Sequence, residues 1–374
     1  MNDLHVLKPF YRVDEVLEEI RPCLESGWTG PGEKTLEFEQ AWRDYTGLEY
    51  AHMVNSATAG LIVALRTLAK IDGWGFGSEI ITTPLTFVST NHAILQQGFK
   101  PVFADVDQYL CLDPADVERR ITSQTRAVMF VGIGGSTGNL REMAALCKRH
   151  GLRLILDAAH MAGTRLDGAH VGAEADVAVF SFQAVKNLPT ADSGMICFRD
   201  EVFAADARRW TWLGINKDTY TRTEKGGRYA WEYDVDRVGY KCHGNAIMAA
   251  MGLVALRHLD EDNAQRREIA KWYDEFLNYS TLLRVPQPRG CESSRHLYQV
   301  RSLDREGLLP KLHEAGIYPG VHYGLNTQYS MYRKDNAPCA VAVLAGSELI
   351  SMPMHLGITQ ADVERIAKVV DGDA

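Results

Sequence analysis

Three consecutive segments decide the fold: RAVMFVGI (126–133), LREMAALCKRHG (140–151) and RLILDAAH (153–160). The first and third are short apolar runs typical of buried strands, and the second has the apolar spacing of an amphipathic helix. A strand, a helix and a second strand in this order form a βαβ unit, because neighbouring parallel strands need a crossover connection. The stretch therefore predicts an α/β protein with a largely parallel sheet between helices.

The same alternation extends in both directions from this unit. Further strand-like runs are AHMVN (51–55), SEIITT (78–83), KPVFADV (100–106), DVAVFSF (176–182) and GMICFRD (194–200). Helical patterns such as SATAGLIVALRTLAK (56–70) separate most of them. We therefore predict a mostly parallel sheet of seven strands, sandwiched between helices.

The alternation of short strand-like runs and helical patterns ends near residue 245. One long helix is predicted over 245–277, followed by a strand in SRHLYQVRSL (294–303), a helix in REGLLPKLHEAG (305–316), and the segments ELISMPMHL (348–356) and ADVERIAKVV (361–370). This composition predicts a smaller α+β unit. We expect a large domain over 12–250 and a small C-terminal domain over 251–374, with residues 1–11 packing against the small domain.

Composition and charge exclude several classes of protein. The 374 residues carry 40 Lys plus Arg against 48 Asp plus Glu, so no excess positive charge favours a nucleic acid or an anionic membrane surface. No apolar run is long enough for a membrane span, and the N-terminus has early acids and no signal-peptide pattern. Seven cysteines without a CxxC pair and twelve dispersed histidines indicate reduced cytoplasmic thiols and no metal site.

Chemically active side chains follow several predicted strands, at the sheet edge where ligands bind in this fold class. Ser56-Ala57-Thr58 opens a helix, where free N–H groups and the helix dipole favour phosphate, although Ser56 or Thr58 can also simply cap that helix. Phe87 can stack on a flat ring or belong to the core. Asp157 ends an apolar strand, so its carboxylate needs either an arginine or a proton-bearing ring nitrogen as partner.

Lys186 follows the strand at 176–182, within SFQAVKNLPTADSGM (181–195). An arbitrary lysine is normally exposed, but a lysine desolvated at this edge, near Ser181 and Asp157, can act as a Schiff-base nucleophile. Pyridoxal 5′-phosphate (PLP) requires such a lysine, an acid for its ring nitrogen, an aromatic side chain against its ring, and hydroxyl groups at a helix N-terminus for its phosphate. The combination predicts a PLP site.

These segments resemble the DegT/DnrJ/EryC1/StrS family of sugar aminotransferases nearly from end to end. The resemblance is carried by SGWTGPG (26–32), NSATAGLIVAL (55–65), TPLTFVSTNHAI (83–94), LDAAHMAG (156–163), SFQAVKNLPTADSGM (181–195), VGYKCHGNAIMAAMG (238–252), VHY (321–323) and SMPMH (351–355). It implies the fold-type I architecture of PLP-dependent transferases, within the aspartate aminotransferase superfamily.

The resemblance also implies a role for each matching residue. Lys186 would form the imine and Asp157 would hold the pyridine nitrogen, which makes them the catalytic pair. The other cofactor-binding residues would be Ala57, Thr58, Phe87, His160 and Ser181, with Lys241 reaching the phosphate of a neighbouring subunit. This implies a homodimer with active sites at its interface. Substrate contacts are expected from Trp28, Thr29, His322 and Tyr323.

The implied reaction moves an amino group from glutamate to a keto-sugar, expected to be a nucleotide-linked deoxy-sugar used in amino-sugar, surface-polysaccharide or antibiotic synthesis. Dehydratases of the family have histidine in place of the imine lysine, so Lys186 favours transamination. A dehydratase, or a PLP-binding regulator without turnover, stays as the alternative. The sequence departs from the family pattern at Ala57, at Ala191–Gly194 and at Val131–Gly135, where the usual histidine is missing. A basic, aromatic stretch over 208–228 is either a solvated loop or an active-site flap.

Overall fold

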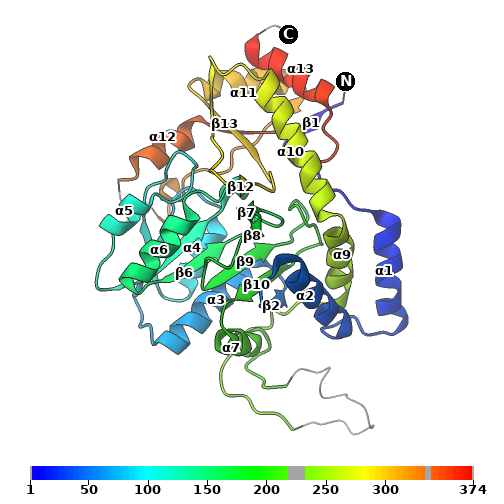
Figure 1. Ribbon diagram of the computed structural model, residues 1–374, viewed down its shortest axis with the longest axis vertical. Coiled ribbons are helices and arrows are strands. Elements are labelled where there is room, and N and C mark those ends of the chain that lie inside the picture. The colour runs from blue at the N-terminus through cyan, green and yellow to red at the C-terminus, as the bar shows by residue number, and fades with distance from the viewer. Residues whose placement is uncertain (1, 218–231, 333–337, 373–374) are drawn as a thin grey trace.

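The computed structural model describes residues 2–217, 232–332 and 338–372, and its centre is a seven-stranded sheet (Figure 1). In spatial order the strands are β2 (Tyr50–Val54), β10 (Gly194–Phe198), β9 (Val177–Ser181), β6 (Arg153–Asp157), β5 (Thr125–Val131), β3 (Glu79–Thr82) and β4 (Lys100–Phe103). β10 is antiparallel to both of its neighbours, and the pairs from β9 to β4 are parallel. The predicted mostly parallel sheet of seven strands is confirmed.

Successive side chains of these strands point alternately into two apolar clusters, one on each face of the sheet. In β6, Leu154 and Leu156 join one cluster and Ile155 joins the other, as the two-residue period of a strand requires. The first face is covered by α2 (Glu33–Thr46), α6 (Leu140–His150) and α9 (Ala246–Arg257), and the second by α3 (Ala57–Asp72), α4 (Val88–Gln96) and α7 (Glu201–Thr211). The sheet is therefore buried on both sides, which explains its continuous apolar runs.

A smaller α+β unit follows in the chain. It contains α10 (Leu259–Phe276), β11 (Leu282–Arg284), β13 (Tyr298–Ser302), α11 (Arg305–Glu314), β14 (Ile317–Tyr318), α12 (Ala340–Glu348), β15 (Leu349–Met352) and α13 (Gln360–Asp371). β1 (Leu4–His5) pairs in parallel with β14, and Leu4 belongs to the apolar cluster of this unit. Both chain ends accordingly lie at this end of the molecule (Figure 1). The domain limits at residues 11/12 and 250/251 stay a prediction.

The single long helix predicted over 245–277 is wrong, because the chain breaks at His258 into α9 and α10. Three acids, Asp260, Glu261 and Asp262, occupy the first turn of α10. Acidic side chains stabilise a helix N-terminus through its dipole, so this cluster favours a new helix start over continuation. The remaining α-helices and strands of the described residues are α1 (Val13–Glu25), α5 (Pro114–Arg119), β7 (Arg165–Leu166), β8 (Ala169–His170) and β12 (Cys291–Glu292).

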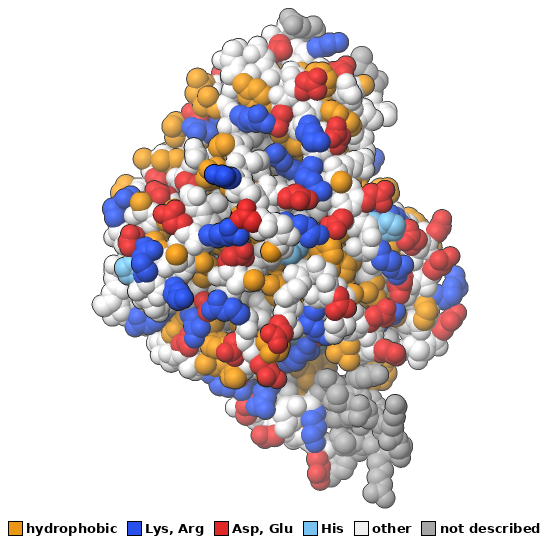
Figure 2. Space-filling view, viewed as in Figure 1, with side chains coloured by type: hydrophobic (Ala, Val, Ile, Leu, Met, Phe, Trp, Pro, Cys, Tyr) orange, Lys and Arg blue, Asp and Glu red, His pale blue; other side chains and the backbone are white. Residues whose placement is uncertain are grey.

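The surface carries charges of both signs, interspersed over the face shown in Figure 2. Within the described residues, no helix is both long and apolar enough to cross a membrane, and no group of three or more acidic, histidine or cysteine side chains is placed to hold a metal ion.

Candidate active site

A cavity of about 410 Å³ opens at the carboxyl ends of β9, β6 and β5. Its walls bring together most of the residues that the sequence singled out. These are Ala57, Thr58, Phe87, Asp157, His160, Ser181, Lys186, His322 and Tyr323. The parallel strands explain the convergence, because their carboxyl ends meet along one edge of the sheet.

Lys186 lies in the turn between β9 and β10, where its backbone N–H donates to the carbonyl of Gln183 at 2.8 Å. Its side chain is mostly buried, and this burial lowers the pKa of the ammonium group to about 8, although Asp157 favours the charged form. A larger share of neutral amine is therefore present near physiological pH than for an exposed lysine. The arrangement suits a nucleophile that must lose its proton before it attacks a carbonyl carbon.

Asp157 ends β6 and is almost completely buried at the floor of the cavity. Its Oδ2 accepts a hydrogen bond from Thr90 Oγ1 at 2.7 Å, and its Oδ1 accepts one from the Ala159 N–H at 3.2 Å. Burial raises the pKa of the carboxyl group, while these two donors and Lys186 lower it. No arginine pairs with Asp157 in the part of the chain that the structure describes. Of the two partners left open by the sequence, a proton-bearing ligand nitrogen fits this site.

Thr90 has a fixed hydrogen-bonding direction that the sequence did not reveal. Its only hydroxyl proton goes to Asp157, so the hydroxyl of Thr86, 2.9 Å from Thr90 Oγ1, must donate to Thr90. The backbone carbonyl of Thr86 is in turn held by the Asn326 side-chain amide at 2.7 Å. Thr90 thus orients the carboxylate and favours its ionised form.

The Thr90→Val protein is expected to fold normally but to need a higher pH for activity. Valine matches threonine in shape yet removes the donor to Asp157, so the carboxyl pKa rises further. The acidic limb of the pH–rate profile should move up by about one to two pH units, the equivalent of one hydrogen bond to a charged group. Thr67→Val is the control, because the buried Thr67 hydroxyl has no hydrogen-bond partner among the residues that the structure describes. If Thr90→Val and Thr67→Val have the same pH–rate profile, Thr90 does not lower the pKa of Asp157.

Aromatic and histidine side chains form the wall above Asp157. Phe87 is 55% exposed despite its apolar ring, and its centroid lies 5.7 Å from that of Tyr323. His160 Nε2 lies 3.0 Å from the Tyr323 hydroxyl, and the His160 ring packs against His296 with centroids 4.2 Å apart. The sequence did not single out His296, since it lies in the predicted strand at 294–303 far from the other site residues. Phe87 faces the cavity and is available to stack on a flat ring.

The N-terminus of α3 forms the opposite end of the cavity. Ser56 Oγ accepts the Ala59 N–H at 3.2 Å and so caps the helix, as the simpler interpretation of this segment predicted. Ala57 and Thr58 nevertheless line the cavity, and Ser181 faces it from the end of β9. Gly194 of β10 allows the close approach, because a Cβ there would lie 2.9 Å from the Ala57 nitrogen. Backbone N–H groups and hydroxyls at a helix N-terminus suit a phosphate.

The cavity therefore fits PLP. It has a carboxylate for the ring nitrogen, an amine for the aldehyde carbon, an exposed aromatic face for the ring, and a helix N-terminus for the phosphate. These groups are the ones such a cofactor requires.

Three of the predicted site residues do not line this cavity. Trp28 Nε1 donates to the carbonyl of Pro31 at 2.9 Å, and the carbonyl of Thr29 accepts the Ala246 N–H at 3.1 Å. Lys241 is exposed, with its Nζ 5.9 Å from the centroid of the Trp212 ring. Their roles stay predictions, and residues 218–228 of the predicted flap lie outside the described part of the chain.

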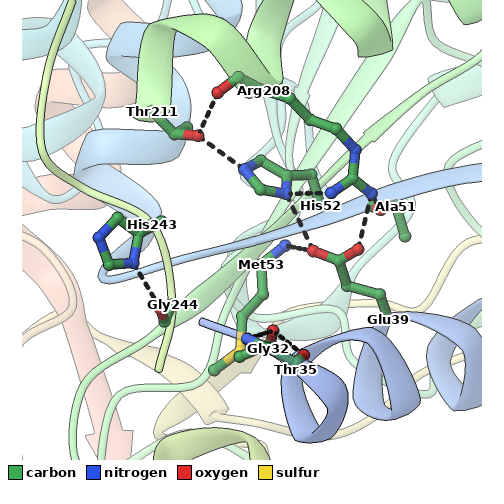
Figure 3. A network of polar contacts seen from close by, with 10 residues as sticks. All are labelled: Gly32, Thr35, Glu39, Ala51, His52, Met53, Arg208, Thr211, His243 and Gly244. Atoms are coloured by element: carbon green, nitrogen blue, oxygen red, sulfur yellow. Dashed lines mark hydrogen bonds and ion pairs between the residues drawn. The ribbon is translucent and has the colours of Figure 1, made fainter. Parts of the chain in front are cut away.

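A polar network around the buried Glu39 is shown in Figure 3, and it lies near the segment that carries Lys241. Glu39 accepts hydrogen bonds from Arg208 at 2.6 Å and from the Met53 N–H at 2.8 Å. Although burial raises it, contacts with His52 and Arg208 lower the pKa of Glu39 to about 2. His52 Nε2 lies 2.7 Å from the hydroxyl of Thr211, whose carbonyl accepts the backbone N–H of Cys242. The network therefore fixes the end of α7 against the strand-like segment that carries Lys241.

Comparisons with known proteins agree with this geometry. The sequence model of the DegT/DnrJ/EryC1/StrS aminotransferase family matches residues 11–371. The chain belongs to this family. It is 38% identical to the spore coat polysaccharide biosynthesis protein SpsC of Bacillus subtilis (strain 168), over 95% of this chain and 93% of SpsC.

Solved structures give the same result. The aminotransferase TlmJ from Streptoalloteichus hindustanus is similar with a TM-score of 0.90 and 32% identity, covering 99% of this chain and 98% of TlmJ. Spr1654 from Streptococcus pneumoniae, solved in a PLP form, gives a TM-score of 0.89 and 25% identity over 100% of both chains. The predicted family, fold-type I architecture, PLP cofactor and enzyme class are confirmed: this DegT/DnrJ/EryC1/StrS member is a PLP-dependent sugar aminotransferase.

Proposed function

We propose that this aminotransferase transfers an amino group from glutamate to a nucleotide-linked keto-deoxy-sugar, as a cytoplasmic homodimer. The observation that carries the proposal is the pairing of a desolvated Lys186 with a buried, hydrogen-bonded Asp157 in one cavity. The relationship to SpsC, named for spore coat polysaccharide biosynthesis, supports a sugar of surface-polysaccharide synthesis. All seven cysteines are free thiols, which agrees with a reducing compartment.

The chemistry assigns distinct roles to the residues of the cavity. When bound, PLP supplies an electron sink that stabilises negative charge on the carbon next to the amino group. Asp157 holds a proton at the ring nitrogen, because a buried carboxylate strongly favours a cationic partner. Lys186 would hold the aldehyde carbon of the cofactor and, as a free amine, would remove and return the proton at the reacting carbon. Ala57, Thr58 and Ser181 hold the phosphate, and Phe87 covers the ring.

The reaction is tested by incubating the protein with glutamate and a panel of nucleotide-linked 3-keto and 4-keto sugars. We expect ketone-dependent formation of 2-oxoglutarate and an aminated sugar, both identified by mass spectrometry. A dehydratase would consume the sugar without forming 2-oxoglutarate, and a regulator would do neither. Turnover with free keto-sugars alone would overturn the nucleotide-linked substrate while leaving the amino transfer in place.

The proposed dimer brings Lys241 into the active site of the neighbouring subunit. In support, the apolar side chains of Leu213, Val235, Val238 and Tyr240 are exposed on the segments around Lys241. An apolar surface of this kind is typical of a protein–protein contact. Among the described residues, the lining of the cavity contains no lysine or arginine except Lys186, so a cation from the partner would complete the phosphate site.

Mixing inactive Lys186→Ala and Lys241→Ala subunits is expected to restore activity to about half of the heterodimers' sites. The site in the Lys241→Ala chain keeps its own Lys186 and receives Lys241 from the other chain. The control mixes wild-type chains with the Lys186→Ala, Lys241→Ala double variant, where each heterodimer should have no intact site. If Lys241 acts within its own chain, the mixture of single variants should have no intact site, and each heterodimer of the control mixture should have one. Activity is measured after denaturation and joint refolding at defined ratios.

A further inference from the structure

His160 can exist in only one neutral tautomer in this site. The backbone N–H of Gly134 donates to His160 Nδ1 at 3.1 Å, so Nδ1 carries no proton. Gly134 reaches this orientation with φ at 61°, in the left-handed region that glycine adopts without strain. Burial, together with the charges of Lys186 and His322, keeps the pKa of His160 well below its usual range. The ring is therefore neutral, and its single proton lies on Nε2.

This tautomer sets the polarity of Tyr323. His160 Nε2 lies 3.0 Å from the Tyr323 oxygen, and since Nε2 holds the proton, the tyrosine oxygen accepts. The hydroxyl proton of Tyr323 must then point to another acceptor, and none exists among the hydrogen bonds of the described residues. Tyr323 lines the same cavity as Lys186 and Asp157. Its hydroxyl is thus a donor whose partner is supplied by a ligand.

Packing contacts fix the positions of the His160 and Tyr323 side chains relative to each other. The His160 ring lies between His296, 4.2 Å away, and Tyr323, whose ring centroid is 5.9 Å away at 27°. Ser294 Oγ donates to the backbone carbonyl of His160 at 2.7 Å. Tyr323 also packs against Phe87. These contacts leave little freedom for the hydroxyl to choose another partner.

We propose that Tyr323 donates its hydroxyl proton to the ring oxygen of PLP and so stabilises the ionised form of that oxygen. The inference rests on the proposed function, in which Phe87 covers the ring face, and it adds that His160, which lines the same cavity, lies at the edge of the ring that carries the hydroxyl. Tyr323 contacts both of these side chains, which places it at that corner of the ring. The charged or titratable groups that line the cavity around it are Asp157, His160, Lys186, Asp192, His296 and His322. Burial and Asp157 both raise the pKa of Tyr323, so it keeps its proton over the working range.

The test is a spectrophotometric pH titration of the cofactor-bound protein, which needs no substrate. A hydrogen bond donated to the ring oxygen stabilises its ionised form. It therefore lowers the pKa of the proton that the ring oxygen shares with the Lys186 nitrogen. In Tyr323→Phe the midpoint of the visible-band titration should therefore rise by about one to two pH units, the equivalent of a hydrogen bond to a charged group. Tyr45→Phe is the matched control, because that hydroxyl bonds to Asp260 outside the cavity. Its midpoint should equal that of the wild type.

Each outcome distinguishes this inference from the proposed function. A Tyr323→Phe midpoint equal to that of Tyr45→Phe overturns the role of Tyr323 while leaving the PLP site in place. A wild-type protein without a visible band after addition of PLP overturns the cofactor site itself. If Tyr323→Phe does not fold, incorporation of a fluorotyrosine at position 323 replaces it. The fluorinated phenol is a stronger donor of the same shape, so the midpoint should then fall.

Discussion

The Lys186→Ala protein is expected to show no visible absorption band after addition of PLP and to lose turnover by about 10³-fold or more. The variant lacks both the nucleophile that attaches the cofactor and the base that moves the proton at the reacting carbon. Alanine leaves the surrounding hydrogen bonds intact, because the Lys186 side chain has no hydrogen-bond partner among the described residues. The measurement combines an absorption spectrum with the rate of 2-oxoglutarate formation.

A Lys186→Arg variant separates the two ways in which the residue could act. Arginine keeps a positive charge near Asp157 but holds its proton at any accessible pH and so cannot serve as a nucleophile. If the amine is required, this variant is as inactive as Lys186→Ala. Substantial activity in Lys186→Arg would show that the site needs only a cation, and the assignment of Lys186 as the imine-forming residue would be wrong.

The cofactor-free protein offers a second measurement on the same lysine. Burial lowers the pKa of Lys186 from its ordinary value of 10.5 to about 8, so between these pH values the unfolded chain binds more protons than the folded one. The free energy of unfolding should therefore rise as the pH increases across this interval. Lys186→Met, which keeps the length of the side chain without its charge, should lose this contribution. An unchanged slope in Lys186→Met would place the lysine amine in solvent.

Local sequence patterns were sufficient for the parts of the site that lie on the sheet. Asp157 ends a buried strand and Lys186 follows another, and parallel strands bring their carboxyl ends together along one edge of the sheet. The burial of the sheet on both faces follows from the continuous apolar runs of the strands, whereas the spatial order of the strands was not predicted. The break at His258 was missed, because apolar spacing continues across it and only the acids of the next turn mark a new helix.

Contacts between distant segments could not be predicted in this way. Thr90 lies inside a helical pattern, and its hydroxyl can donate to Asp157 only because α4 packs beside the end of β6. His296 packs on His160 from a segment of the smaller unit, and it is held there by Asn187, the neighbour of Lys186 in the sequence. Such pairs depend on how the smaller unit sits on the sheet. The spacing of residues in the sequence does not predict that placement. The directions of the hydrogen bonds at Thr90, His160 and Tyr323 could therefore be inferred only from the three-dimensional structure.

Asp157→Asn is expected to retain some PLP but to lower turnover by several orders of magnitude, on the scale of about 10²–10⁴-fold. An amide carries no negative charge, so the ring nitrogen loses the partner that keeps it protonated and electron-withdrawing. Asp157→Ala should be at least as inactive, since it also leaves the Thr90 hydroxyl without its acceptor. Cofactor retention is measured by absorbance after dialysis, and turnover by 2-oxoglutarate formation.

Stability provides the argument that separates a functional Asp157 from a structural one. Because burial raises its pKa, the ionised carboxylate costs the cofactor-free protein free energy at neutral pH, and Asn removes that cost. Unfolding of the cofactor-free Asp157→Asn protein should therefore need as much denaturant as the wild type, or more, while activity collapses. Asp107→Asn is the matched control, since burial raises the pKa of Asp107 to about 6 at a position outside the cavity. That variant should keep its activity. Near-normal rates in Asp157→Asn together with reduced stability would mean that Asp157 supports the fold and that the ring nitrogen has another partner.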